Sequence, residues 1–368
     1  MRVEAFSKFD FFTGVPDSLL QPLNDFIYDT KGIGKDHIVT VNEGAAVAVA
    51  IGYNISTGKV PVVYLQNSGL GNIVNPVTSL TNPKIYGIPM LFVIGWRGEP
   101  GVKDEPQHVF QGEITLSMLE NIGINYYIID KETTQTDFDE ALKNFEQHFE
   151  KGEQCCFIVK KGALSYENKQ NYKNDYTLLR EEAIKEILKY TQENVIVATT
   201  GKISREVYEN RETHEKDFLV VGGMGHASSI ALGIAHNTEK NVTIIDGDGA
   251  VLMHMGALAQ VGQSNLKNIT HIVLNNSAHE SVGGMPTVAN KIDFCSIAKS
   301  CGYSYASSIT DKNLIEQELK KDFDGPKFIE IKVALGSRDD LARPKEAPVQ
   351  NKNEFVKNLL SKGENNGK

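Results

Sequence analysis

Short apolar runs rich in β-branched residues alternate along the chain with longer segments of helical periodicity. In the first half, such runs predict strands at residues 37–41, 60–66, 90–95, 124–130 and 155–161. In the second half, they predict strands at residues 194–200, 217–223, 241–247, 269–276 and 327–333. Strands that alternate with helices are typical of α/β proteins. The pattern therefore predicts two units, each a mainly parallel sheet flanked by helices.

A polar segment near the midpoint separates the two sets of elements. Residues Gly162–Glu182 carry little strand signal and are rich in Asn, Lys, Glu and Tyr, which is typical of a linker. We predict a first domain at residues 1–165, a linker at 166–180, a second domain at 181–345 and a C-terminal tail at 346–368. The last eight residues, 361–368, are polar and predict disorder.

Charge and composition exclude several classes of protein. The 368 residues carry a formal net charge of −9, which argues against general nucleic-acid binding because that function needs a basic surface. No apolar run approaches the roughly 18 residues that span a bilayer, and the first residues do not form a signal peptide. Cys155 and Cys156 are expected to be buried strand thiols in a reducing cytoplasm. We therefore expect a cytoplasmic protein without a membrane or nucleic-acid partner.

The stretch "VTIIDGDGAVLMHMG", Val242–Gly256, places two carboxylates where a buried strand should turn into a helix. In α/β sheets, ligands bind beyond the carboxyl ends of strands. One interpretation is a dinucleotide fold, in which Gly223, Gly225 and Ser228 form a glycine fingerprint and Asp246 binds a ribose. Serine at the third position fits that fingerprint poorly, because close helix packing favours the smallest residue there. The dinucleotide interpretation also leaves the turn around Asp248 unexplained.

A second interpretation pairs Asp248 with the end of the next predicted strand. Roughly 25 residues separate Gly249 from Asn275, which is enough for one helix and one strand. Parallel neighbours would bring Asp248 and Asn276 to the same sheet edge. A carboxylate and an amide oxygen are hard ligands that suit Mg²⁺, which binds few protein groups together with phosphate oxygens.

This G-D-G and N-N pattern resembles the diphosphate-and-magnesium motif of thiamin-diphosphate-dependent enzymes. The resemblance implies a pyrimidine-type domain followed by a diphosphate-type domain, with Mg²⁺ held by Asp248, Asn276 and the backbone carbonyl of Ala278. It also implies a glutamate that hydrogen-bonds the aminopyrimidine ring and promotes loss of the thiazolium proton. Glu43 stands at the expected place, after a predicted strand and behind the candidate N-cap Asn42.

Further segments are similar to the decarboxylase branch of this family. The loop "GVPDS" supplies Ser18, and beside it Asp17, as the polar residue that handles the substrate carboxylate and protons. "QNSGLGN", residues 66–72, resembles the turn of the pyrimidine-binding domain, and Met224 has the position of the apolar wedge that bends the cofactor. The resemblance implies these cofactor-binding residues: Glu43, Gln66, Thr200, Gly201, Met224, Gly247, Asp248, Gly249, Ala250 and Asn276.

The chain has no room for the third domain of larger family members. It resembles the two-domain branch that decarboxylates phosphonopyruvate, or the related branch that acts on sulfopyruvate. The implied reaction converts 3-phosphonopyruvate to phosphonoacetaldehyde and CO2 in phosphonate biosynthesis. The candidates for binding the anionic 2-oxo acid are Arg97, Lys103, His108 and Lys202, and His279 is a candidate for proton transfer.

The resemblance also implies a homo-oligomer, because active sites in this family lie between subunits. Glu43 and Asp248 of one site would then come from different chains. Two other classes stay open at this point: a nicotinamide-dependent oxidoreductase that uses the glycine fingerprint, and a binding protein that keeps the fold without the chemistry. The joint presence of Glu43, Asp248 and Asn276 argues against the second class.

Overall fold

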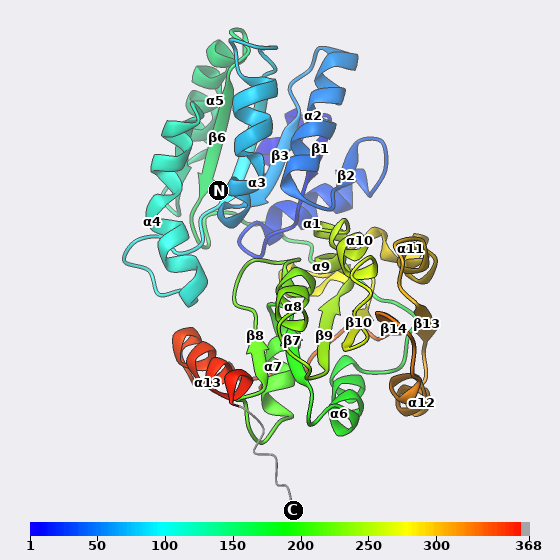
Figure 1. The fold of residues 1–368 in the computed structure, drawn as a ribbon. Coiled ribbons are helices and arrows are strands. Elements are labelled where there is room, and N and C mark those ends of the chain that lie inside the picture. Colours follow the sequence, from blue (N-terminus) through cyan, green and yellow to red (C-terminus); the bar gives the residue numbers. More distant parts are fainter. Residues whose placement is uncertain (362–368) are drawn as a thin grey trace, which may run out of the picture. The chain divides into compact units, whose positions relative to one another are not determined.

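The chain forms two compact units (Figure 1), each described by itself. The computed structural model describes residues 1–361, without the side chain of Ser281. The first unit is Met1–Tyr172 together with Val282–Met285, and the second is Lys173–Ser281 together with the chain from Pro286 onward. Each unit contains one six-stranded parallel sheet, so the predicted fold class is confirmed. The boundary after Tyr172 falls within the predicted linker segment.

The first sheet has the order β2-β1-β3-β4-β6-β5. Its strands are β1 (Phe12–Gly14), β2 (His37–Val39), β3 (Val62–Gln66), β4 (Met90–Gly95), β5 (Asn125–Ile129) and β6 (Gln154–Val159). Both faces are buried, and successive side chains pack into different apolar clusters. Cys155 and Cys156 belong to opposite faces for this reason, and both are fully buried thiols.

Helices cover both faces of the first sheet. They are α1 (Gln21–Lys31), α2 (Glu43–Thr57), α3 (Leu70–Asn75), α4 (Pro106–Asn121) and α5 (Gln135–Phe149), with shorter turns η1 (Val3–Lys8), η2 (Asn67–Gly69) and η3 (Pro76–Thr81). Residues of α1 and α5 pack into one cluster, whereas α2, α3 and α4 contribute to the other. The predicted cap of α2 is confirmed, because the Asn42 side chain accepts a 2.8 Å hydrogen bond from the Ala45 amide. Glu43 is therefore the first residue of α2.

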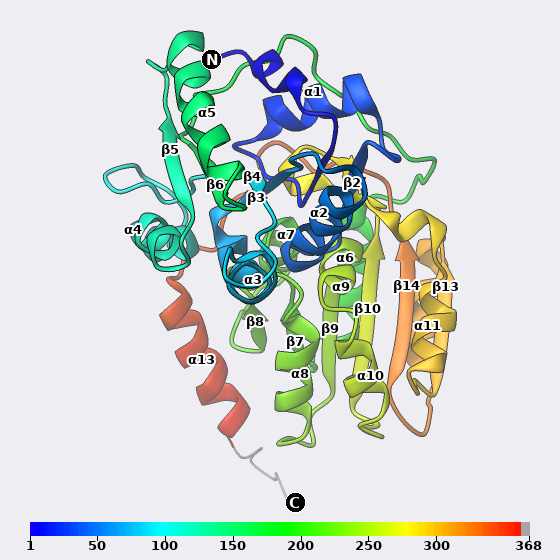
Figure 2. The ribbon, with the colours of Figure 1, turned by 90° about the horizontal axis from the view of Figure 1, so that it is seen from above.

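The second sheet has the order β13-β14-β10-β9-β7-β8, and several of its strands lie side by side in Figure 2. Its strands are β7 (Val195–Ala198), β8 (Asp217–Leu219), β9 (Val242–Gly247), β10 (Ile269–Asn275), β13 (Tyr305–Ile309) and β14 (Lys327–Lys332). Asp246 of β9 pairs with Val273 of β10, so the two strands end beside each other. This register fixes which loops meet at the carboxyl edge.

The helices of the second unit again flank its sheet. They are α6 (Arg180–Tyr190), α7 (Lys202–Glu209), α8 (Ala227–Ala235), α9 (Asp248–Met253), α10 (Ala257–Gly262), α11 (Phe294–Ser300), α12 (Ile315–Lys320) and α13 (Pro348–Leu360). It also contains the short elements β11 (Ala278–His279), η5 (Val288–Lys291) and η6 (Lys312–Leu314). Two more short elements, η4 (Glu280–Val282) and β12 (Met285–Pro286), include residues of both units. Residues of α6 and α7 pack with β7, β9, β10 and β14 in one apolar cluster.

The segment predicted as a C-terminal tail contains helix α13. This helix packs on the edge strand β8, where Phe355 contacts Phe218 and the Asn351 side chain donates a 2.9 Å hydrogen bond to the Asp217 carbonyl. It thereby covers part of an exposed strand edge. The prediction of disorder at residues 361–368 lies, beyond Ser361, outside the described residues.

No helix in the described part of the chain combines the length and the apolar character that a membrane span requires.

Replacing Gly14 by alanine should destabilise the first unit. A Cβ at this position of β1 would overlap the Tyr64 carbonyl oxygen and side chain, and backbone atoms on the neighbouring strand cannot easily move away. We expect a loss of about 1–3 kcal/mol or more in the free energy of unfolding, measured by urea denaturation. Gly52→Ala is the control, because nothing lies near its Cβ position on α2. It should stabilise the helix by about 0.5–1 kcal/mol, and equal effects of both variants would contradict the steric argument.

Candidate active site

Asp17 is a fully buried carboxyl group just beyond the end of β1. It accepts a 2.5 Å hydrogen bond from the Gln66 amide at the end of β3 and a 2.9 Å bond from the Leu19 backbone amide. Burial raises its pKa, and these hydrogen bonds oppose the rise. Gly95, at the end of β4, leaves the space that the carboxylate occupies, since a Cβ there would overlap it. Three strand ends therefore build one acidic position.

Arg97 follows β4 and lies beside this acidic position. Its Nη1 donates a 3.3 Å hydrogen bond to the Ser18 hydroxyl, and its other nitrogens bind the Asp104 carboxylate in a bidentate pair. His108 lies near the same pair. Burial and then the charge of Arg97 lower its pKa to about 4. Within the described residues its Nδ1 is buried without a hydrogen-bond partner. Ser18 and Arg97 thus lie beside Asp17, and His108 lies near the Arg97–Asp104 pair.

Lys103, another candidate for substrate binding, differs from Arg97 and His108 in its exposure to solvent. It is an exposed residue in the loop between β4 and α4, whereas Arg97 and His108 are partly buried. The structure therefore brings Arg97 and His108 together and leaves Lys103 at the surface.

Glu43 is a second buried carboxylate at the same edge of the first sheet. It is 6% exposed, and its Oε2 accepts a 2.7 Å hydrogen bond from the Asn72 side chain. A Cβ at Gly69 would lie 2.5 Å from Glu43 Oε1, so only glycine fits beside this carboxylate. The turn at residues 66–72 therefore contacts both acids of the first unit, with Gln66 on Asp17 and Asn72 on Glu43.

Asp248 occupies the corresponding edge of the second sheet. It is 3% exposed, its Oδ2 accepts a 2.6 Å hydrogen bond from the Thr287 hydroxyl, and the backbone amides of Gly249 and Asn276 also donate to it. Burial raises its pKa to about 7 despite these hydrogen bonds. The parallel pairing of β9 and β10 therefore brings Asp248 and Asn276 into direct contact, as the strand argument expects.

Asn276 is held on several sides. Its Oδ1 accepts a 3.1 Å hydrogen bond from the Ala278 amide, its Nδ2 donates a 2.7 Å bond to Glu280, and its carbonyl accepts from the Asn174 side chain. The described residues contain no group of three or more His, Cys, Asp or Glu side chains that would hold a metal alone. One carboxylate with amide and carbonyl oxygens fits Mg²⁺ when phosphate oxygens complete its coordination.

Two other predicted residues, Met224 and His279, lie close to Gly249 at this edge of the sheet. A Cβ there would lie 3.3 Å from Met224 Cε and 3.4 Å from His279 Nδ1. Burial lowers the pKa of His279 to about 4, so its ring is neutral near pH 7. The Ala250 carbonyl packs closely against Gly225 in the Met224 loop. Met224, Gly249, His279 and the Asp248 carboxylate therefore share one location.

The turn between β7 and α7 lies next to this location. Gly201 adopts a positive φ of 96° before the first turn of α7, and Thr200 Oγ1 accepts a 3.2 Å hydrogen bond from the Gly222 amide. Ile203 packs 3.4 Å from the Cβ position of Gly247. Lys202 is paired, since its Nζ donates a 3.0 Å bond to Glu280.

Asp246 is buried and does not fit the dinucleotide interpretation. It is 1% exposed, and its Oδ2 lies 3.6 Å from His271 Nε2 on the neighbouring strand. A ribose-binding acid would have to face a ligand instead. Asp246 is a core residue of the second sheet.

Sequence reasoning missed the residues that support these groups. It did not predict the following contacts: Thr287 with Asp248, Asn72 with Glu43, Asp104 with Arg97, and Glu280 with both Asn276 and Arg180. Thr287 and Glu280 stand close to the N-N motif in sequence, but no spacing rule identifies their contacts. Their partners become visible only in the folded unit.

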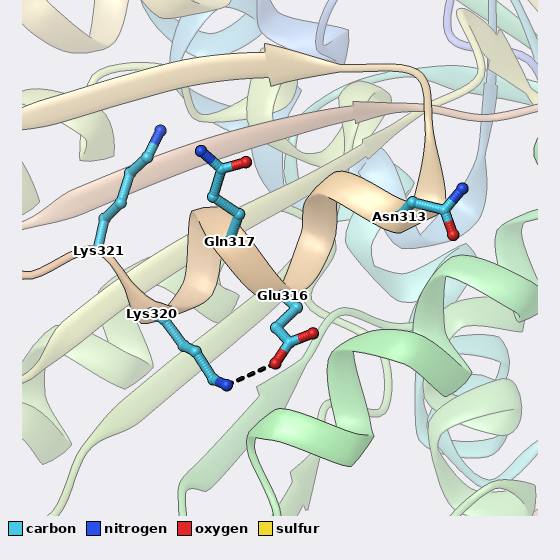
Figure 3. A pocket seen from close by; sticks show the side chains of 5 residues that line it. All are labelled: Asn313, Glu316, Gln317, Lys320 and Lys321. Atoms are coloured by element: carbon cyan, nitrogen blue, oxygen red, sulfur yellow. Dashed lines mark hydrogen bonds and ion pairs between the residues drawn. The ribbon is translucent and has the colours of Figure 1, made fainter.

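A surface depression on the second unit lies on helix α12 and contains none of the predicted residues (Figure 3). Asn313, Glu316, Gln317, Lys320 and Lys321 line it, and Glu316 pairs with Lys320 across one helical turn. Its lining of solvated side chains indicates a helix surface.

Comparisons with known proteins agree with the two units. Residues 5–120 match the N-terminal, and residues 199–331 the C-terminal, thiamine pyrophosphate binding domain of thiamine pyrophosphate enzymes. The chain is 34% identical to a phosphonopyruvate decarboxylase of Streptomyces viridochromogenes, over 92% of this chain and 88% of that protein. A phosphonopyruvate decarboxylase of Streptomyces hygroscopicus is 32% identical, with 91% and 86% covered. A sulfopyruvate decarboxylase of Methanosarcina acetivorans is 29% identical, with 77% and 78% covered.

The chain belongs to the thiamine pyrophosphate enzyme family, whose cofactor is also called thiamin diphosphate. Within this family it is an oxo-acid decarboxylase, and therefore a lyase. Membership excludes the nicotinamide-dependent oxidoreductase as an interpretation of the glycine fingerprint.

Replacing Thr287 by valine should destabilise the second unit. The hydroxyl donates to the buried Asp248 carboxylate and accepts from the Ala289 amide, and an isosteric methyl group does neither. Losing a hydrogen bond to a buried acid costs about 1–3 kcal/mol, which urea denaturation would measure. Thr287→Ser keeps the hydroxyl and should stay closer to wild type. Equal stabilities of the two variants would show that the hydroxyl contributes nothing.

Proposed function

We propose that the chain catalyses the thiamin-diphosphate- and Mg²⁺-dependent decarboxylation of 3-phosphonopyruvate to phosphonoacetaldehyde and CO2. The observation that supports this substrate is the Arg97 guanidinium, which donates to Ser18 beside the buried acid Asp17, together with the buried His108 nitrogen near the Arg97–Asp104 pair. The identity to two phosphonopyruvate decarboxylases over about nine-tenths of the chain points the same way. The reaction would take place in the cytoplasm and serve phosphonate biosynthesis.

The second unit would hold the diphosphate and the metal. Asp248, Asn276 and the Ala278 carbonyl supply oxygen ligands for Mg²⁺, and the Thr200–Gly201 turn with Gly247 and Gly249 lets backbone amides approach the diphosphate. Met224 would contact the cofactor from the side of Gly249. When bound, thiamin diphosphate supplies a carbon nucleophile and accepts the electrons released with CO2.

The first unit would supply proton handling at two places. Glu43, fixed by Asn72, would hydrogen-bond the aminopyrimidine ring, with Gln66 in the adjoining turn. Asp17, whose pKa is raised by burial, and Ser18 would bind the substrate carboxylate and hold the proton that the product carbon receives. His279 of the second unit, neutral near pH 7, would assist this proton transfer.

The doubly negative phosphonate needs fixed donors. Arg97 keeps its orientation through Asp104 and turns Nη1 toward Ser18, while His108 offers a buried nitrogen without a protein partner in the described part of the chain. Arg97 and His108 are therefore the proposed binders. Lys103 and Lys202 are weaker candidates, because one is exposed at the surface and the other is paired with Glu280.

The proposed substrate is tested by comparing CO2 release from phosphonopyruvate, sulfopyruvate and pyruvate. We expect the highest kcat/KM with phosphonopyruvate, because Arg97 complements the charge of its phosphonate and His108 offers a ring nitrogen to its oxygens. A higher value with sulfopyruvate would assign the chain to the sulfopyruvate decarboxylases instead. A higher value with pyruvate would show that no anionic group is recognised.

Arg97→Gln serves as the matched variant in this comparison. Loss of a charged hydrogen-bond donor should raise the KM for phosphonopyruvate by about tenfold or more and leave the KM for pyruvate less affected. Lys103→Gln is the control, because Lys103 lies exposed in the same loop. Equal effects of both substitutions would remove Arg97 from the proposed substrate site.

We further propose a homo-oligomer in which Glu43 and Asp248 of one active site come from different chains. Glu43→Gln and Asp248→Asn should each abolish most activity when present in all subunits. Co-expression of both variants should restore about a quarter of the wild-type activity in a dimer, because half of the random pairs contain one intact site. Absence of restored activity in isolated mixed dimers would mean that each site uses both residues of one chain.

A further inference from the structure

The side-chain amide of Asn276 is fixed by the Glu280 carboxylate, which accepts hydrogen bonds and donates none. Asn276 Nδ2 lies 2.7 Å from Glu280 Oε2, so the amide must turn its NH2 group toward Glu280. The amide oxygen then points the other way, where the Ala278 amide donates to one of its two lone pairs. No other donor in the described part of the chain binds this oxygen, so its second lone pair can face a cation. An unrestrained asparagine would present either end of its amide.

Glu280 is itself held rigidly. Its Oε2 accepts a 2.6 Å bond from Arg180 Nη1, and its Oε1 accepts a 3.0 Å bond from Lys202 Nζ. Because both oxygens of the Glu280 carboxylate accept hydrogen bonds from cationic side chains, this group acts only as an acceptor toward Asn276.

Arg180 anchors this arrangement at the first residue of α6. Its side chain is 5% exposed, and Nε and Nη2 bind the buried Glu206 carboxylate at 2.7 and 2.8 Å. Glu206 and Glu280 thus share one guanidinium, but only Glu280 contacts Asn276. Substitutions of the two glutamates can therefore separate an effect on Asn276 from a general effect of losing a carboxylate next to Arg180.

We propose that Glu280 is a positioning residue for the metal site: it selects the amide orientation of Asn276 that presents Oδ1 to Mg²⁺. This inference rests on the proposed function, in which Asp248 and Asn276 bind the cation. Replacing a group that orients a metal ligand typically lowers metal affinity by about 10- to 100-fold. Glu280 has that relation to Asn276.

The test is the Mg²⁺ dissociation constant of the full-length protein with saturating thiamin diphosphate, measured by titration calorimetry. Glu280→Gln removes the acceptor-only group and lets the Asn276 amide turn over, so Mg²⁺ binding should weaken about 10- to 100-fold. Glu206→Gln is the matched control, because it also removes a carboxylate from Arg180 while leaving the contact to Asn276. It should change Mg²⁺ binding by about twofold at most, even where both variants lower the unfolding temperature alike.

The possible results are distinct. Weakened Mg²⁺ binding in Glu280→Gln together with near-wild-type binding in Glu206→Gln supports the proposal, whereas wild-type affinity in Glu280→Gln or equal losses in both variants overturn it. If the wild-type protein binds thiamin diphosphate without requiring Mg²⁺, the metal site of the proposed function fails first. If Mg²⁺ binds the wild type and every variant equally, the metal site stands and only the role of Glu280 is wrong.

Discussion

Buried carboxylates at the carboxyl ends of parallel strands are the feature on which this molecule depends. Asp17, Glu43 and Asp248 are 0, 6 and 3% exposed. An ionised carboxylate loses several kcal/mol of hydration on burial unless donors replace the water. Gln66 and Asn72, both in the turn at residues 66–72, and Thr287 in the second unit supply such donors. The same requirement therefore fixes the loops relative to the strands of each unit.

Glycines that let the backbone approach these side chains closely also help to accommodate the buried acids. Gly69 and Gly95 lie directly against the carboxylates of Glu43 and Asp17, and Gly249 lies against Met224 and His279. A side chain at these positions would occupy the space of the acid or of its neighbours. Both units bury a carboxylate in the same way. The acid lies at the end of a strand, a neighbouring loop donates a hydrogen bond to it, and a glycine leaves space for both.

The larger features of this arrangement follow from local pattern. Ten of the twelve strands in the two sheets were predictable because apolar runs with turn signals mark them, whereas β1 and β13 were missed. The cap of α2 was predictable because Asn42 precedes an alanine-rich helix. The contact between Asp248 and Asn276 followed from the neighbouring parallel strands of the second sheet. Supporting contacts were not predictable, since Thr287 is 39 residues from Asp248 and Arg180 is 100 residues from Glu280. The positive charges of Lys202 and Arg97 are evident from the sequence. Their ion-pair partners, Glu280 and Asp104, are not, because these pairs depend on loop conformation.

The sequence by itself determined the α/β class, ten of the twelve strands of the two sheets and the family motifs at Glu43, Asp248 and Asn276. These depend on short-range periodicity and on residues that stand close to a strand end. Only the tertiary structure decided which donors satisfy each buried acid, that Asp246 belongs to the core, and that Glu280 faces the amide of Asn276. The reason is physical: hydrogen-bond partners are selected by burial and by the direction of side chains, which exist only after distant segments pack.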